Sequence, residues 1–226
     1  MGIFDFFTGK KQGPGIEAIE LDTWDWQEVQ KAKNIVVWQN SEFPAQLSVN
    51  YFPTAPDLPR PLKDVDHLRD FYRRKLARAK GAILIVEPFQ LNGYRAIETL
   101  FRIPQKKQEG FIYVGSYTIP FADRSYVVKV QEQEFTHIGE RERMIMERLL
   151  KDRPKEIGED GQPIGWEFDP YDPAYEGEFK MNKSEEVRFD LWYPEHPLTH
   201  VRQYMYRLKN ELKFSDEMKA LAELED

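Results

Sequence analysis

The sequence contains no cysteine. This absence excludes disulfide bonds, a thiolate nucleophile, and sites in which cysteine binds zinc or an iron–sulfur cluster. Long apolar runs are also missing, because the longest, Ala82–Val86, falls far short of the roughly 20 residues that span a membrane. Residues 1–11 lack the basic segment and the apolar run of about 7–15 residues that mark an export signal. We therefore expect a cytoplasmic protein without a membrane span.

An excess of charge is absent from most of the chain. The 226 residues carry 32 Lys+Arg and 39 Asp+Glu, a net charge of −7. Residues 1–150 hold 21 basic and 20 acidic side chains, whereas residues 151–226 hold 11 and 19, so the excess acid lies in the last third. Because residues 1–150 are close to neutral, they offer no general electrostatic surface for nucleic acid, and nucleic-acid binding is not expected. Hydrophobic residues (41%) and aromatic residues (14%) are plentiful enough for a folded core.

A helix is predicted over residues 64–80. Asp64 or Asp66 is a suitable N-cap, apolar residues recur at helical spacing, and Gly81 stands where a left-handed residue commonly ends a helix. The opposite face is basic and includes Arg69, Arg73 and Arg74. That face could bind phosphate or acidic groups, or it could simply be a solvated helix face; the second interpretation is favoured.

Strands are predicted on both sides of this helix. Residues 35–38 and 46–52 precede it, with Leu47, Val49 and Tyr51 on one face of the second strand. Four strands follow at 81–87, 93–103, 110–120 and 124–134, joined by links too short for parallel crossovers, so they must be antiparallel neighbours. A further helix is expected over 139–150. This order predicts an α+β fold, an antiparallel sheet flanked by helices.

The chain is expected to divide near residue 150. Residues 1–150 would form the α+β domain, with residues 1–16 as a flexible or docking N-terminus. Residues 151–226 would form an acidic, aromatic-rich extension that packs on the domain. The extension begins as an irregular segment rich in Pro, Gly, Asp and Glu, and ends in two helices, one over 198–212 and one starting at Ser215.

The stretch over residues 43–150 resembles the superfamily of small sandwich proteins that contains PsbP, DcrB and the yeast Ran-release factor. The resemblance depends on a strand ending in a proline-rich break (residues 49–56), a helix, a strand–Asn92-Gly93–strand hairpin with Ala96, the aromatic strand Phe111–Ile119, the strand Tyr126–Gln131 and a closing helix after Gly139-Glu140. It implies an α/β/α sandwich with an antiparallel sheet. It also implies an accessory or binding role without a catalytic site.

No motif for catalysis or cofactor binding is present, and we expect no catalytic, cofactor or metal site. Gly13-Pro14-Gly15 lacks the residues of a phosphate-binding loop. His196 and His200 have the i, i+4 spacing of metal ligands, with Glu195 beside them, but Pro197 indicates that the helix starts between them and leaves His196 outside. Glu132 and Glu134 are expected to face solvent on a strand edge.

Two sets of residues are candidate functional sites. A possible small-molecule pocket is formed by Trp24, Trp26, Trp38, Tyr94, Glu98 and Arg102; among these, Tyr94, Glu98 and Arg102 share one strand face. A possible interaction surface contains Arg69, Arg73, Arg74, Trp166, Tyr171 and Tyr175. The favoured function is a non-catalytic protein-interaction or accessory module with an unidentified protein partner. The alternatives are a small-molecule-binding protein or enzyme that uses the Trp/Tyr-lined pocket, and an inhibitor of a basic partner.

Overall fold

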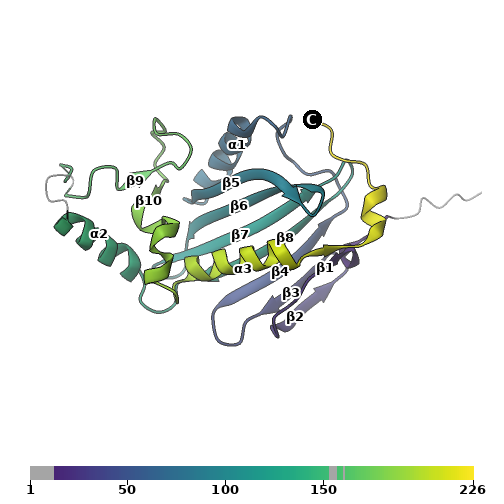
Figure 1. The fold of residues 1–226 in the computed structure, drawn as a ribbon, viewed down its shortest axis with the longest axis horizontal. Helices are drawn as coiled ribbons and strands as arrows, with labels where there is room; N and C mark the ends of the chain where they lie inside the picture. The colour runs from purple at the N-terminus through teal and green to yellow at the C-terminus, as the bar shows by residue number, and fades with distance from the viewer. Residues whose placement is uncertain (1–12, 153–156, 160) are drawn as a thin grey trace, which may run out of the picture.

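A seven-stranded antiparallel sheet forms the centre of the molecule (Figure 1). The computed structural model describes residues 13–152, 157–159 and 161–226; the predictions for residues 1–12 lie outside this part. The sheet order is β2-β3-β4-β8-β7-β6-β5. The strands are β2 (Gln27–Ala32), β3 (Ile35–Gln39), β4 (Ala45–Phe52), β5 (Ala82–Leu91), β6 (Tyr94–Pro104), β7 (Phe111–Pro120) and β8 (Ser125–Gln133). The predicted α+β class and the antiparallel meander are therefore confirmed.

Side chains alternate between the two faces of the sheet along each strand, and apolar side chains on one face form much of the core. In β4, Leu47, Val49 and Tyr51 are buried on one face, as predicted. The β5–β6 hairpin turns at Asn92 and Gly93, whose φ values of 50° and 88° lie in the left-handed region that tight two-residue hairpin turns require.

Helix α1 (Val65–Ala77) covers one face of the sheet over β5 and β6. Asp64 is its N-cap and accepts a hydrogen bond from the His67 amide at 3.0 Å. The expectation that Gly81 takes the left-handed position after the helix is wrong: Lys80 adopts φ 54° instead, because the helix ends earlier, at Ala77. The rest of this face, on β4, β8 and β7, is polar and half-buried, as at Gln46 and Lys129.

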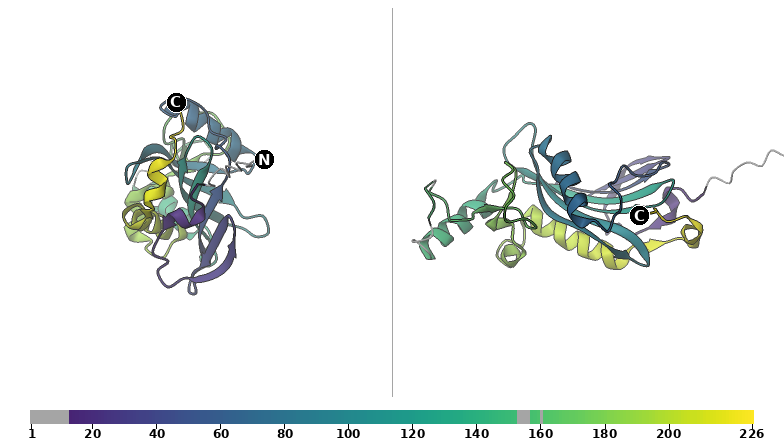
Figure 2. Two further views of the ribbon diagram at one scale, coloured as in Figure 1. Left: turned by 90° about the vertical axis from the view of Figure 1, so that its right-hand side faces the viewer. Right: turned by 90° about the horizontal axis from the view of Figure 1, so that it is seen from above.

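Helix α3 (Pro197–Glu211) covers the opposite face (Figures 1 and 2). It buries Leu198, Val201, Met205 and Leu208 against β7 and β8. Gly115 of β7 permits the close approach, since a Cβ atom there would lie 2.2 Å from the Met205 Sδ atom. The second helical layer of the sandwich thus comes from the end of the chain, and the helix expected to close the sandwich lies elsewhere.

That other helix, α2 (Glu140–Asp152), extends from one end of the sheet (Figures 1 and 2). It packs on the 3-10 turns η2 (Lys183–Glu185) and η3 (Val187–Trp192), with Ile145, Trp166 and Phe189 as a small buried cluster. The short strands β9 (Glu167–Phe168) and β10 (Met181–Asn182) pair in the same region. This end of the molecule therefore has its own small core.

The remaining elements close the other end. The 3-10 turn η1 (Ile16–Ala18) leads into β1 (Ile19–Glu20), which pairs with β11 (Lys213–Phe214) after α3. The second C-terminal helix is a short 3-10 turn, η4 (Asp216–Ala220). Leu224 is then buried in the α1 cluster, so the end of the chain crosses from the α3 side of the sheet to the α1 side. Within the described residues, no helix is long and apolar enough to cross a membrane.

A candidate binding groove at the start of helix α3

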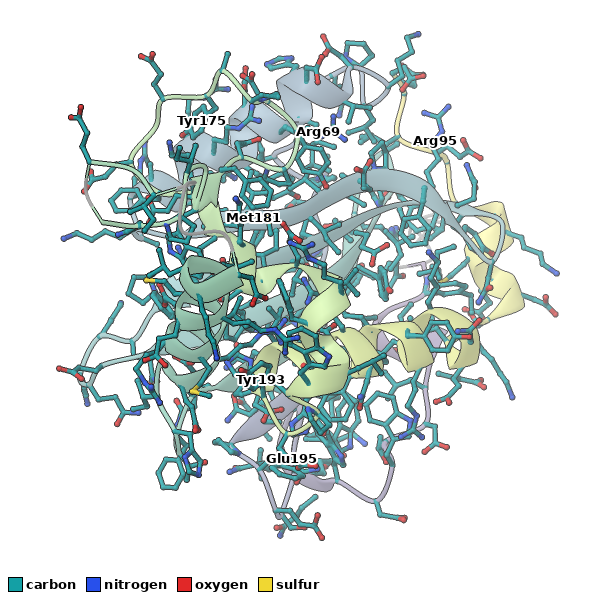
Figure 3. All side chains as sticks on the ribbon, turned by 60° about the vertical axis from the view of Figure 1, so that its left-hand side comes forward. Arg69, Arg95, Tyr175, Met181, Tyr193 and Glu195 are labelled. Carbon is teal, nitrogen blue, oxygen red and sulfur yellow. The ribbon has the colours of Figure 1, made fainter. Side chains whose placement is uncertain are left out.

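A groove of about 630 Å³ opens where β8, η3 and the start of α3 meet. Its walls carry aromatic side chains, prolines and carboxylates. The residues that line it are Glu42, Phe43, Pro44, Glu132, Gln133, Phe135, Thr136, His137, Glu140, Arg141, Trp192, Tyr193, Pro194, Glu195, His196 and Pro197. In Figure 3, Tyr193 and Glu195 lie close together at this end of the molecule.

Two buried carboxylates, one in β8 and one directly after it, lie at this end of the sheet. Glu132 and Glu134 are only 2% and 3% exposed, so the expectation that they face solvent on a strand edge is wrong. The reason is topological: β8 lies inside the sheet between β4 and β7, and its even-numbered residues face α3. Each buried carboxylate is accompanied by a histidine from the start of α3.

Glu132 is paired with His200. The His200 Nδ1 atom lies 2.9 Å from Glu132 Oε1, and Phe43 packs against the imidazole ring. Burial raises the pKa of Glu132 above its usual range. Desolvation lowers the pKa of His200, but the hydrogen bond and charge of Glu132 outweigh it and the net pKa is raised. Within the part of the chain that the structure describes, Glu132 Oε2 has no hydrogen-bond partner, and it has almost no contact with solvent.

Glu134 is paired with His196, the N-cap of α3. The Leu198 amide donates to His196 Nδ1 at 3.1 Å, so the neutral ring carries its proton on Nε2. That Nε2–H donates to Glu134 Oε1 at 3.3 Å. Desolvation lowers the pKa of His196 despite the nearby carboxylate. As predicted, the helix begins at Pro197 and leaves His196 outside.

The buried side chain of Arg141 connects the segments that form one wall of the groove. Its side chain is 2% exposed and donates to the Ser184 carbonyl, Thr199 Oγ1 and Asp190 Oδ1 at 2.7, 3.1 and 2.8 Å. Asp190 also accepts a hydrogen bond from Arg202 at 2.8 Å. This network links α2, η2, η3 and α3, and so fixes the position of the segment that forms one wall of the groove.

The outer part of the groove is apolar and acidic. Phe135 and Trp192 are 67% and 49% exposed, and the neighbouring Leu191 is 90% exposed. Glu42 is exposed and the side chain of Glu195 is 79% exposed. Glu195 directly precedes the helix cap, where the positive end of the α3 dipole favours a carboxylate.

The residues proposed as a small-molecule pocket fall into separate places. Trp24 and Trp26 pack around Tyr204 of α3, and Trp38 lies partly buried on the same face of the sheet. Tyr94, at the opposite end of the sheet from the groove, contacts Phe121 and Phe214.

Glu98 and Arg102 share a strand face with Tyr94, as predicted, but they have different partners. Glu98 lies 3.8 Å from Lys209 Nζ of α3. Arg102 lies 3.1 Å from Glu185 and also donates to the Lys180 carbonyl at 2.7 Å. None of these residues lines the groove at the start of α3.

Most of the proposed interaction surface is used within the chain. Arg73 of α1 donates to both oxygens of Asp169 at 2.9 and 2.7 Å, and its guanidinium lies over Tyr175. Arg69 lies 3.6 Å from the centre of the Tyr171 ring; Figure 3 shows Arg69 and Tyr175 beside α1. Arg74 is exposed and Trp166 is buried beside α2. The interpretation of the basic face as simply solvated therefore fails for Arg69 and Arg73, which a segment of the same chain covers, whereas Arg74, Lys75 and Arg78 are exposed.

The groove itself was not predicted from the sequence. The i, i+2 spacing of Glu132 and Glu134 and the i, i+4 spacing of His196 and His200 were both visible, but nothing indicated that they would meet. Among the described residues, no group of three or more His, Cys, Asp or Glu side chains is arranged to hold a metal ion.

Comparisons with known proteins give similarities at low identity. No family model and no curated protein matches the chain. The chain is similar to the Ran-binding protein Mog1p of Saccharomyces cerevisiae, with 14% identity over 53% of this chain and 74% of that one (TM-score 0.39). It is also similar to a variant of Mog1, with 11% identity over 88% and 92% (TM-score 0.42). A Bacteroides thetaiotaomicron protein is 6% identical over 54% of this chain (TM-score 0.33), and the chain spans 40% of its length. The fold class itself rests on the sheet and helices described above.

Proposed function

We propose that this chain is a non-catalytic protein-interaction module that binds its partner through the groove at the start of α3. The observation that carries the proposal is the exposed apolar surface there: Phe135 and Trp192 line the groove, and the exposed Leu191 is next to Trp192 in the chain. Large exposed apolar side chains gathered around a concave surface are typical of protein-binding sites. The hydrogen bonds of Arg141 behind these side chains fix one wall of the groove, which is consistent with a binding surface that is already formed before the partner binds.

The hydrogen bonds of His196 support binding rather than catalysis at that residue. Both of its ring nitrogens are engaged, one by the Leu198 amide and one by Glu134. His200 is held by Glu132 on Nδ1, and its Nε2 lies 3.8 Å from Glu195, which is too far for a hydrogen bond. A general base needs a free nitrogen within reach of a substrate. The similar protein Mog1p binds Ran, but its similarity to this chain is too low to transfer that partner.

Site-specific photo-crosslinking tests the proposal. A photoreactive phenylalanine analogue replaces Phe135 in the groove or the neighbouring Leu191, and replaces Val29, a 49% exposed residue of β2, as the matched control. We expect one protein to be crosslinked from both groove positions and not from position 29. The Trp192→Ala substitution should remove these crosslinks while the circular dichroism spectrum stays unchanged. The same crosslinks from position 29, or none from the groove, would refute the proposed role.

A further inference from the structure

One carboxylate that lines the groove is only partly hydrogen-bonded. Glu132 is 2% exposed, yet its Oε2 atom has no hydrogen-bond partner among the described residues. A buried carboxylate oxygen without a donor is costly, because water is removed and no hydrogen bond replaces it. Within the described chain, His200 satisfies only the other oxygen, Oε1.

Carboxylates outnumber cationic groups among the residues that line the groove, and His200 faces only the other oxygen of Glu132. Glu42, Glu132, Glu140 and Glu195 line the groove. The only arginine or lysine among its lining residues is Arg141, and Asp190 already accepts from that guanidinium. Because the walls are of low polarity, the field of these carboxylates is concentrated inside the groove.

The aromatic walls suit the same kind of ligand. Trp192 already has the Arg148 guanidinium 4.2 Å above its ring, and the Arg141 guanidinium lies 5.8 Å from the ring of Tyr193. Aromatic faces attract cations and also pack on the methylene groups of lysine and arginine. A groove with aromatic walls, an acidic mouth and an unpartnered buried carboxylate is complementary to a long cationic side chain.

We propose that the groove receives a lysine or arginine side chain of the partner protein, with its cationic end directed toward Glu132 and its methylene groups between the aromatic walls. This inference rests on the proposed function and specifies the partner as a protein segment that carries an exposed basic residue among apolar ones. Glu42 and Glu195 lie at the mouth and attract the segment. An anionic or purely apolar segment would lack a group that complements these carboxylates.

The test uses the full chain and two synthetic peptides. One is a fluorescein-labelled Gly-Leu-Lys-Leu-Lys-Leu-Gly peptide, and the other has glutamine in place of both lysines. Fluorescence anisotropy should show that the lysine peptide binds about tenfold more tightly than the glutamine peptide. Glu132→Gln should remove that preference.

Glu98→Gln is the matched control, since Glu98 is another partly buried carboxylate on the same sheet face, is paired with Lys209, and lies outside the groove. It should leave the preference unchanged. Glu195→Gln, on a side chain that is 79% exposed, keeps the test valid if Glu132→Gln fails to fold: it should weaken lysine-peptide binding and reduce its dependence on salt.

Three results would overturn the inference. They are equal binding of both peptides, no binding of the lysine peptide, or unchanged lysine-peptide binding when Glu132→Gln and Glu195→Gln are both folded. The proposed function fails separately, through the crosslinking experiment. If the peptides bind equally and Trp192→Ala weakens both, the groove still binds protein segments, but without a preference for a cation.

Discussion

At the scale of single residues, the two histidines at the start of α3 show how position sets protonation. His196 and His200 are four residues apart, and they are paired with Glu134, directly after β8, and with Glu132 of β8. The Nδ1 atom of His196, however, accepts a hydrogen bond from the Leu198 amide at the helix cap, whereas the Nδ1 atom of His200 is hydrogen-bonded to Glu132. The first ring is therefore held neutral and the second is favoured as a cation, a difference that follows from where the helix begins.

We predict that the two histidines titrate on opposite sides of the ordinary value of 6.5. The pKa of His196 should lie below it, because burial disfavours the charged ring, and the pKa of His200 should lie above it. The raised pKa of His200 means that its contribution to stability is present below pH 6.5 and is lost as pH rises through the folded-state pKa. Imidazole NMR titration measures both values. Glu132→Gln should lower the pKa of His200, and an unchanged value would contradict the pairing.

Arg141 gives a second residue-scale prediction. Its guanidinium is buried and hydrogen-bonded to three segments, so Arg141→Ala leaves Asp190 and two carbonyl or hydroxyl groups without this donor. We expect a loss of about 3–5 kcal/mol in the free energy of unfolding, measured by urea denaturation. Arg143→Ala, on the same helix but with a 59% exposed salt bridge to Glu147, should cost less than about 0.5 kcal/mol. Equal losses would contradict the bracing role of Arg141.

At the scale of elements, helix α3 is the last α-helix of the described chain, and it covers one face of the sheet. It covers β7 and β8 and carries the histidines that meet Glu132 and Glu134. Gly115 allows this helix to lie close to the sheet, because a side chain at that position would meet Val201 and Met205.

We predict that Gly115→Ala destabilises the protein by about 1–3 kcal/mol through overpacking against α3. Combining it with Met205→Ala should be less harmful than the sum of the two single changes, since the shortened side chain makes room for the new methyl group. Urea denaturation of the four proteins in this cycle measures the coupling. Additive effects would mean that the two positions do not compete for space.

Residues 169–175 pack on helix α1, and the contact between Arg73 and Asp169 leads to the next prediction. Arg73 and Asp169 are 11% and 4% exposed at the side chain. Desolvation raises the pKa of Asp169, but the Arg73 hydrogen bond and charge and two backbone amides outweigh it, and the net pKa is lowered. The carboxylate therefore stabilises the fold above its unfolded pKa, with 3.8 the ordinary value, and loses this effect as pH falls through the lower folded-state pKa.

Asp169→Asn should accordingly cost about 2–4 kcal/mol near neutral pH. The gap from the wild type should narrow below pH 3.8, as measured by denaturation at several pH values. Asp70→Asn is the control: Asp70 contacts the same arginine at 2.6 Å but is 53% exposed, so it should cost less than about 1 kcal/mol. If the two variants were equally unstable, the segment would not depend on this buried pair.

The elements themselves could be predicted from the sequence better than their contacts. Short links specified the hairpins, and Asp64 and Pro197 marked where two helices begin, because these signals are local. Glu132 was wrongly predicted to face solvent. The alternation along a strand indicates which residues share a face of the sheet, but it does not indicate which face a helix will cover. Arg73 and Asp169 are 96 residues apart, and only the charge difference between the two parts of the sequence hinted that they would meet.

At the scale of the whole molecule, the last third packs on the rest of the chain through aromatic and a few charged side chains, while many of its carboxylates, such as Glu176 and Glu178, are exposed. Its Asp169, Tyr171 and Tyr175 contact arginines of α1, Trp166 is buried beside α2, and α3 lies on the sheet. Charges that complement each other within the chain are not available to a partner. The groove at the start of α3 combines exposed carboxylates with exposed apolar side chains.

The central claim is that this groove is the surface through which the protein binds a basic segment of its partner. Its most direct test is a ¹H–¹⁵N correlation spectrum of the labelled full chain, recorded while the Gly-Leu-Lys-Leu-Lys-Leu-Gly peptide is added. We expect the resonance shifts to concentrate at residues 42–44, 132–137 and 192–197, and we expect the matched glutamine peptide to cause much smaller shifts. Shifts centred on α1 or on the exposed face of β4, β8 and β7, or no shifts at all, would contradict the central claim.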